Sequence, residues 1–576
     1  MKAVPETLAV RVVNEWRRYD IVAHLGVRYY LDSTCAVRDR WASEVAVRQV
    51  VGDNRPCYHE TFHFKERKQD GSFEYRCIHT PTPNEILAEA ALVHQCSLMQ
   101  HGMRNANCVY SYQLPHSEDG RGIFQPYFEG FLQRHTDIVA ACRRNPKGTV
   151  LYADIERFYP SIKSDIAMRI WGDCTHDADL PEWARELGSS LLEKYAAAEK
   201  AQAEQVLTGP MFTHLLANLV LKRVDDVMQD ALPGGYFRYV DDFALIGDLT
   251  KLRQAKAILA NELDHVELHL HPKKGFEVPT AHWLHGEGDF GDDVKSPSWK
   301  VFVGSMRQML LRRPDCIGAL TDQLRDAGFR IMPLDYSAII KERSYLSRML
   351  RFWRDKSWRR MMRQQTLQEI MALGLALRQR YRDMYESAIV GIADLHGYER
   401  KRRIHALRHY AGRLVYLEES SRFGAMAKSL EAIQEMHLFA AVYDALATAD
   451  VSKLIYYGVN GVQAAAQPLK AMGHPLRCSC QNWSKVALQG RAILLAHGIR
   501  LDERGSTSVS AHPMTIFCGW LDGASNLAAN HASFFGRLAC LHGRDDERRH
   551  AAILGTAFDI DDNLAFEMDD IMHQSS

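Results

Sequence analysis

Hydrophobic and polar residues follow two different patterns along the 576-residue chain, and the pattern changes near residue 305. Between residues 148 and 304, short apolar runs typical of strands alternate with segments of helical spacing; the runs are GTVLYADI, YFRYV, FALIG and WKVFVG. Residues 1–150 mix short apolar runs with turn signals such as QDGS and TPTPN. We therefore expect an α/β arrangement up to residue 305.

After residue 305, Leu, Met, Ala, Arg and Glu recur at helical spacing, as in SYLSRMLRFW and KSLEAIQEMHLFAAVYDAL. This pattern predicts a nearly all-helical remainder, built as a stack of antiparallel helices. The length alone predicts two to four domains.

The overall composition excludes some classes of protein but identifies no partner. Hydrophobic residues make up 46% of the chain, and Lys+Arg and Asp+Glu are equal at 71 each, so net charge gives no nucleic-acid signal. No apolar run approaches the roughly 18 residues that a membrane helix needs, and the first residues lack a signal-peptide pattern. We expect a cytoplasmic protein.

The twelve cysteines are scattered, which predicts reduced thiols rather than a disulfide framework. One cluster, formed by His474, Cys478 and Cys480, contains residue types that bind zinc. Its spacing is not that of a usual zinc site, and no second pair follows. A structural role for these thiols is the favoured interpretation.

Two acidic sites indicate phosphate chemistry. In YVDD, residues 239–242, adjacent aspartates follow a strand-like run, and such carboxylates raise each other's pKa unless a cation lies between them. Asp154 ends the apolar run VLYADI, where a charge is costly unless it is paired or bound to a cation. If the two strands are neighbours, Asp154, Asp241 and Asp242 converge into a site suited to Mg²⁺. The alternative is that each aspartate caps a turn.

Several segments, in this order, resemble the motifs of the reverse transcriptases. YADIERFYPSI resembles motif A, TGPMFTHLLANLVL motif B, YVDD motif C, and LHLHPKKG followed by WKVFVGS motifs D and E, while YRCIHTPTPNEIL upstream resembles the fingers segment. Within this superfamily, the chain most closely resembles the bacterial abortive-infection and defence-associated branch. The features that carry this finer resemblance are the sequence DIERFYPSI, the YSYQL at 110–114 and the helical C-terminal half.

The resemblance implies a right-hand polymerase, with α/β fingers and palm followed by an all-α thumb and a helical C-terminal domain. The fingers and the start of the palm would occupy residues 1–150 and the rest of the palm 151–305. A basic, thumb-like helical region would occupy 306–420, and a helical domain with an acidic tail 421–576.

The resemblance also implies roles for individual residues. Asp154, Asp241, Asp242 and the backbone carbonyl of Ile155 would bind two Mg²⁺ ions, for which Mn²⁺ is a substitute; two such ions activate an attacking hydroxyl and stabilise the leaving pyrophosphate. Lys274 would protonate the pyrophosphate, a role for which Lys273 competes.

Substrate contacts are implied in three segments. Tyr159 falls on the steric-gate position, where its ring would exclude a 2′-hydroxyl and select deoxynucleoside triphosphates; otherwise it is a core aromatic residue. Arg76 would hold the triphosphate, or it is a surface arginine. Three residues of motif B would line the nucleotide site: Gly209, Pro210 and Thr213.

Two departures from the family pattern leave templating open. Thr208 stands where many members have Gln and Thr213 where Ser is usual, and motif D reads HPKKG. Phe302 and Gly304 lie where the primer-grip hairpin is expected, although VFVG is also typical of a plain strand.

A basic helical segment follows the motifs. Residues 341–382 contain twelve Lys or Arg against three acids. On a helical wheel one basic face gathers around Phe352 and includes Arg348, Arg351, Arg359 and Arg363. Such a face suits the phosphates of a template-primer duplex, and the alternative is a solvated surface helix. A second basic cluster lies at 398–413, and the last residues are acidic.

The resemblance implies an RNA-directed DNA polymerase, and the branch that the chain resembles implies a role in antiphage defence. Its expected partners are deoxynucleoside triphosphates and an RNA or DNA template-primer, with a dedicated noncoding RNA, a second copy of the chain or a partner defence protein as further candidates. Protein-primed or untemplated synthesis stays open. A nucleotidyl cyclase is disfavoured by motif B and Lys274, and a non-catalytic RNA-binding scaffold by the retention of three costly carboxylates.

Overall fold

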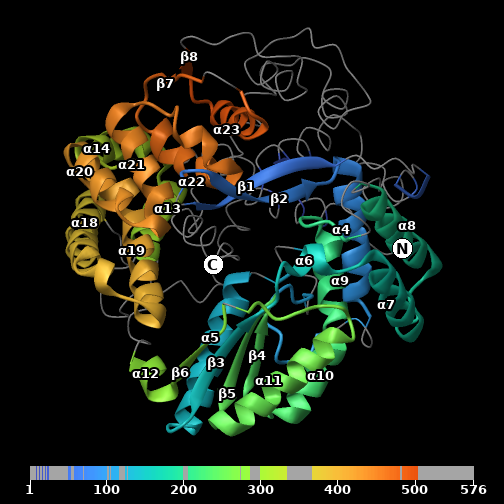
Figure 1. Cartoon of the computed structure of the whole chain (residues 1–576). Coiled ribbons are helices and arrows are strands. Elements are labelled where there is room, and N and C mark those ends of the chain that lie inside the picture. The colour runs from blue at the N-terminus through green and yellow to red at the C-terminus, as the bar shows by residue number, and fades with distance from the viewer. Residues whose placement is uncertain are drawn as a thin grey trace. The chain divides into compact units, whose positions relative to one another are not determined.

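The computed structural model divides the chain into two compact units. It describes residues 58–68, 70–99, 105–115, 123–125, 127–198, 205–272, 274–285, 299–333, 366–480 and 483–503, together with 8, 12, 16, 20, 23, 24, 27, 48, 50–52 and 103. Unit 1 comprises 1–61, 77–288 and 525–546, and unit 2 comprises 62–76, 289–524 and 547–576. The elements of both units are labelled in Figure 1.

Unit 1 contains an antiparallel sheet of four strands. Their order is β4 (Tyr236–Tyr239), β5 (Asp242–Gly247), β3 (Thr149–Asp154) and β6 (Phe276–Pro279). Four consecutive residues of β5, from Phe243 to Ile246, are buried, because the sheet is covered on both faces. The strand predictions for GTVLYADI, YFRYV and FALIG are confirmed.

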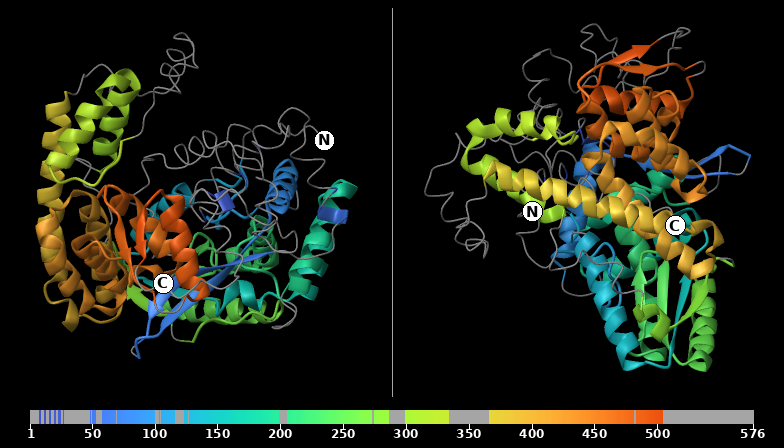
Figure 2. Two further views of the ribbon diagram at one scale, coloured as in Figure 1. Left: turned by 90° about the horizontal axis from the view of Figure 1, so that it is seen from above. Right: turned by 90° about the vertical axis from the view of Figure 1, so that its left-hand side faces the viewer.

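Helices pack against this sheet on both sides. Helix α5 (Tyr127–Arg144) contacts β4 and β5, and α11 (Leu249–Asp264) contacts β5 and α10 (Lys222–Ala231). The right panel of Figure 2 shows the strands between the blue-cyan helix and the green helices. The short α12 (Thr280–His285) contacts α5 and β6.

Five further helices among the described residues of unit 1 enclose one hydrophobic core, which is continuous with the inner residues of the sheet. They are α4 (Pro83–Ser97), α6 (Phe158–Ser161), α7 (Ser164–Asp177), α8 (Glu182–Ala198) and α9 (Met211–Val220). The carboxylate of Glu89 accepts a 2.7 Å hydrogen bond from the Met211 N–H and so satisfies the start of α9. Burial raises the pKa of Glu89 to about 8.

Unit 2 is mainly helical. Its helices are α13 (Trp299–Arg312), α14 (Ile317–Asp326), α18 (Leu367–Ile389), α19 (Gly397–Leu417), α20 (Ser420–Glu431), α21 (His437–Thr448), α22 (Gly458–Lys470) and α23 (Lys485–Ala496). Short 3-10 turns lie at Pro314–Cys316, Ile392–Asp394, Gln434–Met436 and Leu454–Tyr456. Its described residues also form the parallel strands β7 (Leu476–Cys478) and β8 (Leu501–Glu503). The helical prediction is confirmed for the described part of this region.

The unit boundary runs through a hairpin formed by β1 (His59–Arg67) and β2 (Phe73–Thr80), so that residues 62–76 belong to unit 2. There the Phe64 N–H donates to the side chain of Asn460 at 2.8 Å, and the Tyr75 hydroxyl donates to the Tyr456 carbonyl at 2.7 Å. The expected domain boundaries at 150 and 305 therefore do not coincide with the compact units.

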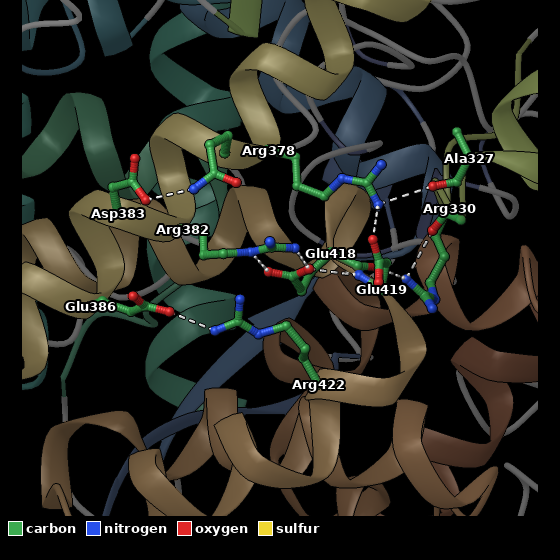
Figure 3. Close-up of polar contacts among 11 residues, drawn as sticks. Ala327, Arg330, Arg378, Arg382, Asp383, Glu386, Glu418, Glu419 and Arg422 are labelled. Atoms are coloured by element: carbon green, nitrogen blue, oxygen red, sulfur yellow. Dashed lines mark hydrogen bonds and ion pairs between the residues drawn. The ribbon is translucent and has the colours of Figure 1, made fainter.

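A network of ion pairs joins α18 to the corner between α19 and α20 (Figure 3). The Glu418 carboxylate accepts hydrogen bonds from Arg382 Nε at 2.9 Å and Nη2 at 2.5 Å. Arg378 pairs with Glu419 at 3.2 Å, and Arg330 donates to the Glu418 carbonyl at 2.7 Å. These contacts link three elements, so they stabilise the corner.

One strand prediction is wrong. The segment WKVFVG begins helix α13, in which Trp299, Phe302, Val303, Met306 and Leu310 are buried. This spacing of three and four residues places them on one face of a helix, and packing of that face overrides the strand preference of Val and Phe. No helix among the described residues is long and apolar enough to cross a membrane.

Candidate active site

Three carboxylates lie at one end of the unit 1 sheet. Asp154 ends β3 directly opposite Asp242, the first residue of β5. Asp241 lies in the turn between β4 and β5, and its carbonyl accepts a 3.1 Å hydrogen bond from the Ile155 N–H. The predicted adjacency of the Asp154 strand and the YVDD hairpin is therefore confirmed.

Two cationic side chains neutralise this acidic strand end. Lys274 Nζ lies 2.9 Å from Asp154 Oδ2, as expected for a lysine of the candidate site. Arg134, on α5, donates from Nη1 to Asp242 Oδ2 at 2.8 Å and from Nη2 to the Asp242 carbonyl at 3.1 Å. Burial opposes the charge on Arg134, but Asp242 outweighs it and raises the pKa of the guanidinium above its usual value.

The carboxylates differ in how well they suit a metal ion. Asp154 Oδ2 is buried and accepts no hydrogen bond of good geometry from the described residues, although Lys274 is close. Within the described ranges no three His, Cys, Asp or Glu side chains are grouped to hold a metal as they stand. Hard carboxylate oxygens still fit Mg²⁺ chemically, and because Arg134 engages Asp242, Asp154 and Asp241 are the better candidates.

The turn that presents Asp241 has a strained backbone. Val240 has φ of +54°, a region that β-branched residues rarely adopt. Its N–H donates to Ser111 Oγ at 2.7 Å, and its carbonyl accepts from Arg238 Nη1 at 2.9 Å. Strain of this kind persists where the surroundings fix the backbone, often at functional sites.

A buried polar network lies behind the turn. The guanidinium of Arg238, on β4, donates from Nε and Nη2 to the two carboxylate oxygens of Asp225 at 2.7 Å each, and both side chains are almost inaccessible. Arg238 Nη1 also donates to Asn218 at 3.1 Å, and the Tyr236 hydroxyl donates to Asp225 at 2.7 Å. The network fixes Arg238 and, through it, the Val240 carbonyl.

The motif B glycine is required by its surroundings. Gly209 has φ of +121°, and a Cβ there would lie 2.5 Å from Ile78 Cγ2 and 2.7 Å from the His79 carbonyl oxygen. The neighbouring Thr208 carbonyl accepts a 2.7 Å hydrogen bond from the His79 N–H. Only glycine allows this close approach.

The predicted substrate contacts in motif B are only partly supported. Pro210 is buried, and Thr213 is fully buried on α9, where its hydroxyl makes no hydrogen bond with the described residues. The contact of Thr213 with a nucleotide stays a prediction, and in this structure its side chain has no accessible surface. Tyr159 is half-buried, and its hydroxyl lies 2.7 Å from His214 Nδ1.

Three other predicted residues, Arg76, Phe302 and Gly304, belong to unit 2. Arg76 belongs to the part of β2 that is assigned to unit 2. Phe302 and Gly304 lie on α13, and Phe302 is fully buried against Trp299 and Phe329. The prediction of a primer-grip hairpin at Phe302 and Gly304 is therefore wrong.

The basic face predicted at Arg348, Arg351, Arg359 and Arg363 lies outside the described residues, as do Lys273 and the acidic tail. The second basic cluster forms part of α19. Arg400 pairs with Glu435 at 2.8 Å, and Arg403 donates to the Ser387 carbonyl at 2.7 Å. These two arginines stabilise unit 2 internally.

The thiols near β7 form no metal site with the described side chains. Cys478 is buried, and Cys480 Sγ lies 3.0 Å from the Tyr456 hydroxyl. No disulfide joins the cysteines among the described residues.

Sequence reasoning missed Arg134, His214 and the pair of Arg238 and Asp225. For Arg238 and His214 the sequence did contain a signal. Arg238 interrupts the apolar run YFRYV and His214 interrupts MFTHLLANLV, and a polar residue in a buried segment implies a buried partner. Arg134 carried none, because one arginine on an amphipathic helix is ordinary.

The sequence matches no protein-family model, and a search of the curated proteins finds no match.

Proposed function

We propose that this protein is a metal-dependent nucleotidyltransferase of the right-hand polymerase type, and more narrowly an RNA-directed DNA polymerase. The proposal is carried by the grouping of acidic side chains at one end of the sheet. Asp154 and Asp242 are direct strand partners, and Asp241 lies in the adjoining strained turn, next to Val240. Lys274 forms an ion pair with Asp154. The order of motifs that resemble reverse transcriptases supports the narrower reading.

In the proposed reaction, a 3′ or protein hydroxyl forms a bond to the α-phosphorus of a deoxynucleoside triphosphate, and pyrophosphate leaves. Asp154 and Asp241 would hold Mg²⁺, which when bound stabilises the charge on the attacking and leaving oxygens. Lys274, whose side chain is 41% exposed, can reach a leaving phosphate and give it a proton. Arg134 keeps Asp242, at the start of β5, in place.

Sugar selection and cellular role belong to the same proposal. Tyr159 would exclude ribonucleotides by contact with the 2′-hydroxyl. A role in defence against phage, with a noncoding RNA template or a protein primer, rests on the resemblance to the defence-associated branch. Arg76 stays a candidate for triphosphate binding.

The experiment is to purify the protein with its accompanying nucleic acid and supply labelled deoxynucleotides with Mg²⁺ or EDTA. We expect Mg²⁺-dependent incorporation that Asp241→Ala abolishes and that Asp173→Ala, an exposed aspartate on α7, leaves unchanged. Label that stays with the denatured polypeptide until protease is added would identify a protein primer. Label that migrates as free DNA would identify a nucleic-acid primer. Incorporation by Asp241→Ala at the wild-type rate would overturn the proposal.

A further inference from the structure

An aromatic stack, defined here as Tyr112, His214 and Tyr159, lies beside the carboxylate turn. The His214 ring lies parallel to the Tyr112 ring, with centroids 3.9 Å apart and planes 5° from parallel. The Tyr159 hydroxyl lies 2.7 Å from His214 Nδ1, and its ring meets the imidazole edge-on. Phe124 packs edge-on against Tyr112. The Tyr159 ring is thus held by both a hydrogen bond and packing.

The imidazole in this stack is neutral. Burial lowers the pKa of His214 to about 3, so at neutral pH one ring nitrogen carries a proton and the other accepts a hydrogen bond. With the proton on Nε2, Nδ1 accepts the hydrogen bond that the Tyr159 hydroxyl donates. This assignment leaves no charge to be stabilised inside the stack.

A hydrogen bond between a backbone N–H and a side-chain hydroxyl connects the stack to the candidate site. Ser111, next to Tyr112, accepts the hydrogen bond from the Val240 N–H in the turn that carries Asp241. Tyr112 has φ of +47°, and Arg157, two residues before Tyr159, has φ of +49°. Three non-glycine residues with positive φ therefore lie in or next to the stack and the turn: Tyr112, Arg157 and Val240. Such positions are costly and are retained where surrounding contacts fix them.

We propose that His214 is a positioning residue for sugar selection: it holds the Tyr159 ring in place, so that discrimination against ribonucleoside triphosphates depends on the whole stack. This inference rests on the proposed function. A ring excludes a 2′-hydroxyl only if it cannot move aside, and positioning to within about 0.5 Å requires side chains that are themselves fixed. Tyr159 is only half-buried, so the core alone does not immobilise it.

The test compares the efficiency of ribonucleotide and deoxynucleotide incorporation as a ratio of kcat/KM values. Tyr159→Ala should raise this ratio most. His214→Phe keeps a ring against Tyr112 but removes the hydrogen bond, and Tyr159→Phe removes the same hydrogen bond from the other side. Each of these two variants should raise the ratio by about five- to tenfold, which corresponds to the free energy that one hydrogen bond contributes. The double variant should show no further increase, because the bond is lost only once.

A second comparison separates positioning from general structural damage. In a Tyr159→Ala background, His214→Phe should leave the ratio unchanged, since a positioning residue acts only through the ring it holds. Equal losses with both sugars, and an unchanged ratio in both His214→Phe and Tyr159→Phe, would overturn the inference. If His214→Phe does not fold, Tyr159→Phe decides alone by the same ratio.

The outcomes distinguish this inference from the proposed function. Absence of Mg²⁺-dependent incorporation in the wild type would remove both. Incorporation with a ratio that Tyr159→Ala changes but His214→Phe and Tyr159→Phe do not would remove only the role of His214.

Discussion

The corner of unit 2 and the candidate site of unit 1 both join carboxylates to cationic side chains, but the bonding differs. Both oxygens of Glu418 accept hydrogen bonds from Arg382, and its side chain is 1% exposed. Asp154 Oδ2 is also buried, but its partner is a single, partly exposed lysine, Lys274, whose Nζ lies 2.9 Å away, and no well-formed hydrogen bond reaches it from the described residues. A carboxylate bonded through both oxygens stabilises a fold, whereas a buried oxygen with only a partly exposed lysine beside it needs a further explanation, such as a bound cation.

The backbones differ in the same sense. Glu418 has ordinary extended dihedral angles, φ −78° and ψ 156°. Val240, beside Asp241, has φ of +54°. The comparison therefore predicts that substitutions in the corner change stability, and that substitutions at the carboxylates change chemistry.

The largest expected effect on stability lies in the network behind the turn. Asp225→Ala would leave the fully buried guanidinium of Arg238 without its counter-charge, which should lower the free energy of unfolding by about 3–5 kcal/mol. The control is the next residue: Asp226→Ala alters an exposed side chain and should change the free energy by less than about 0.5 kcal/mol. Urea unfolding measures both, and equal values would contradict the network's role.

The next effect is on rate. Lys274→Gln removes the proposed proton donor and should slow incorporation by about 100-fold. It should change urea unfolding little, because an ion pair whose lysine is 41% exposed contributes little to stability. Lys251→Gln, at an exposed position on α11, is the matched control. A wild-type rate for Lys274→Gln would show that this lysine only neutralises the charge of Asp154 and is not the proton donor.

A smaller effect is expected at the unit 2 corner. Arg382→Ala should cost about 2 kcal/mol at pH 7, less than for a fully buried pair because Arg382 is 21% exposed. Burial raises the pKa of Glu418, but the hydrogen bonds from Arg382 and the Glu419 N–H outweigh it and lower that pKa below its usual value of 4.5.

The pH dependence of this effect follows from the lowered pKa of Glu418. The ion pair stabilises the fold above the unfolded-state pKa of about 4.5, and this contribution is lost as pH falls through the lower folded-state value. The difference between wild type and Arg382→Ala should therefore shrink below pH 4.5. A difference that stays constant down to pH 3 would contradict the assignment.

The smallest effect on stability is expected at Asp154. Asp154→Asn removes a charge next to Asp242 and gives up the ion pair with Lys274, in which the lysine is 41% exposed and Asp154 14%. The free energy of unfolding should change by less than about 0.5 kcal/mol. A loss above 2 kcal/mol would place Asp154 with Glu418, among the structural carboxylates.

Local patterns predicted the part of the site that lies on strands. The apolar run before Asp154 and the two runs around YVDD were enough to place β3, β4 and β5. The primer-grip prediction failed because WKVFVG is too short to show a period, and only the later apolar residues Met306 and Leu310 identify the helix.

Long-range partners were beyond local patterns. Arg134 and Asp242 are 108 residues apart, and Tyr159 and His214 are 55 apart. Neither pair leaves a periodic signal in the sequence, because each depends on how α5 and α9 pack in unit 1. The available clue was a single polar residue, Arg238 or His214, within an apolar segment. This clue predicts that the residue has a buried partner, but it does not identify the partner.

The most direct test compares the two regions in one assay. Asp154→Asn and Arg382→Ala are each assayed for Mg²⁺-dependent incorporation of a labelled deoxynucleotide at 20 °C and for urea unfolding. The account predicts that Asp154→Asn loses incorporation and keeps its stability, whereas Arg382→Ala loses stability and keeps incorporation. Wild-type incorporation by Asp154→Asn would contradict the assignment of the strand-end carboxylates to catalysis.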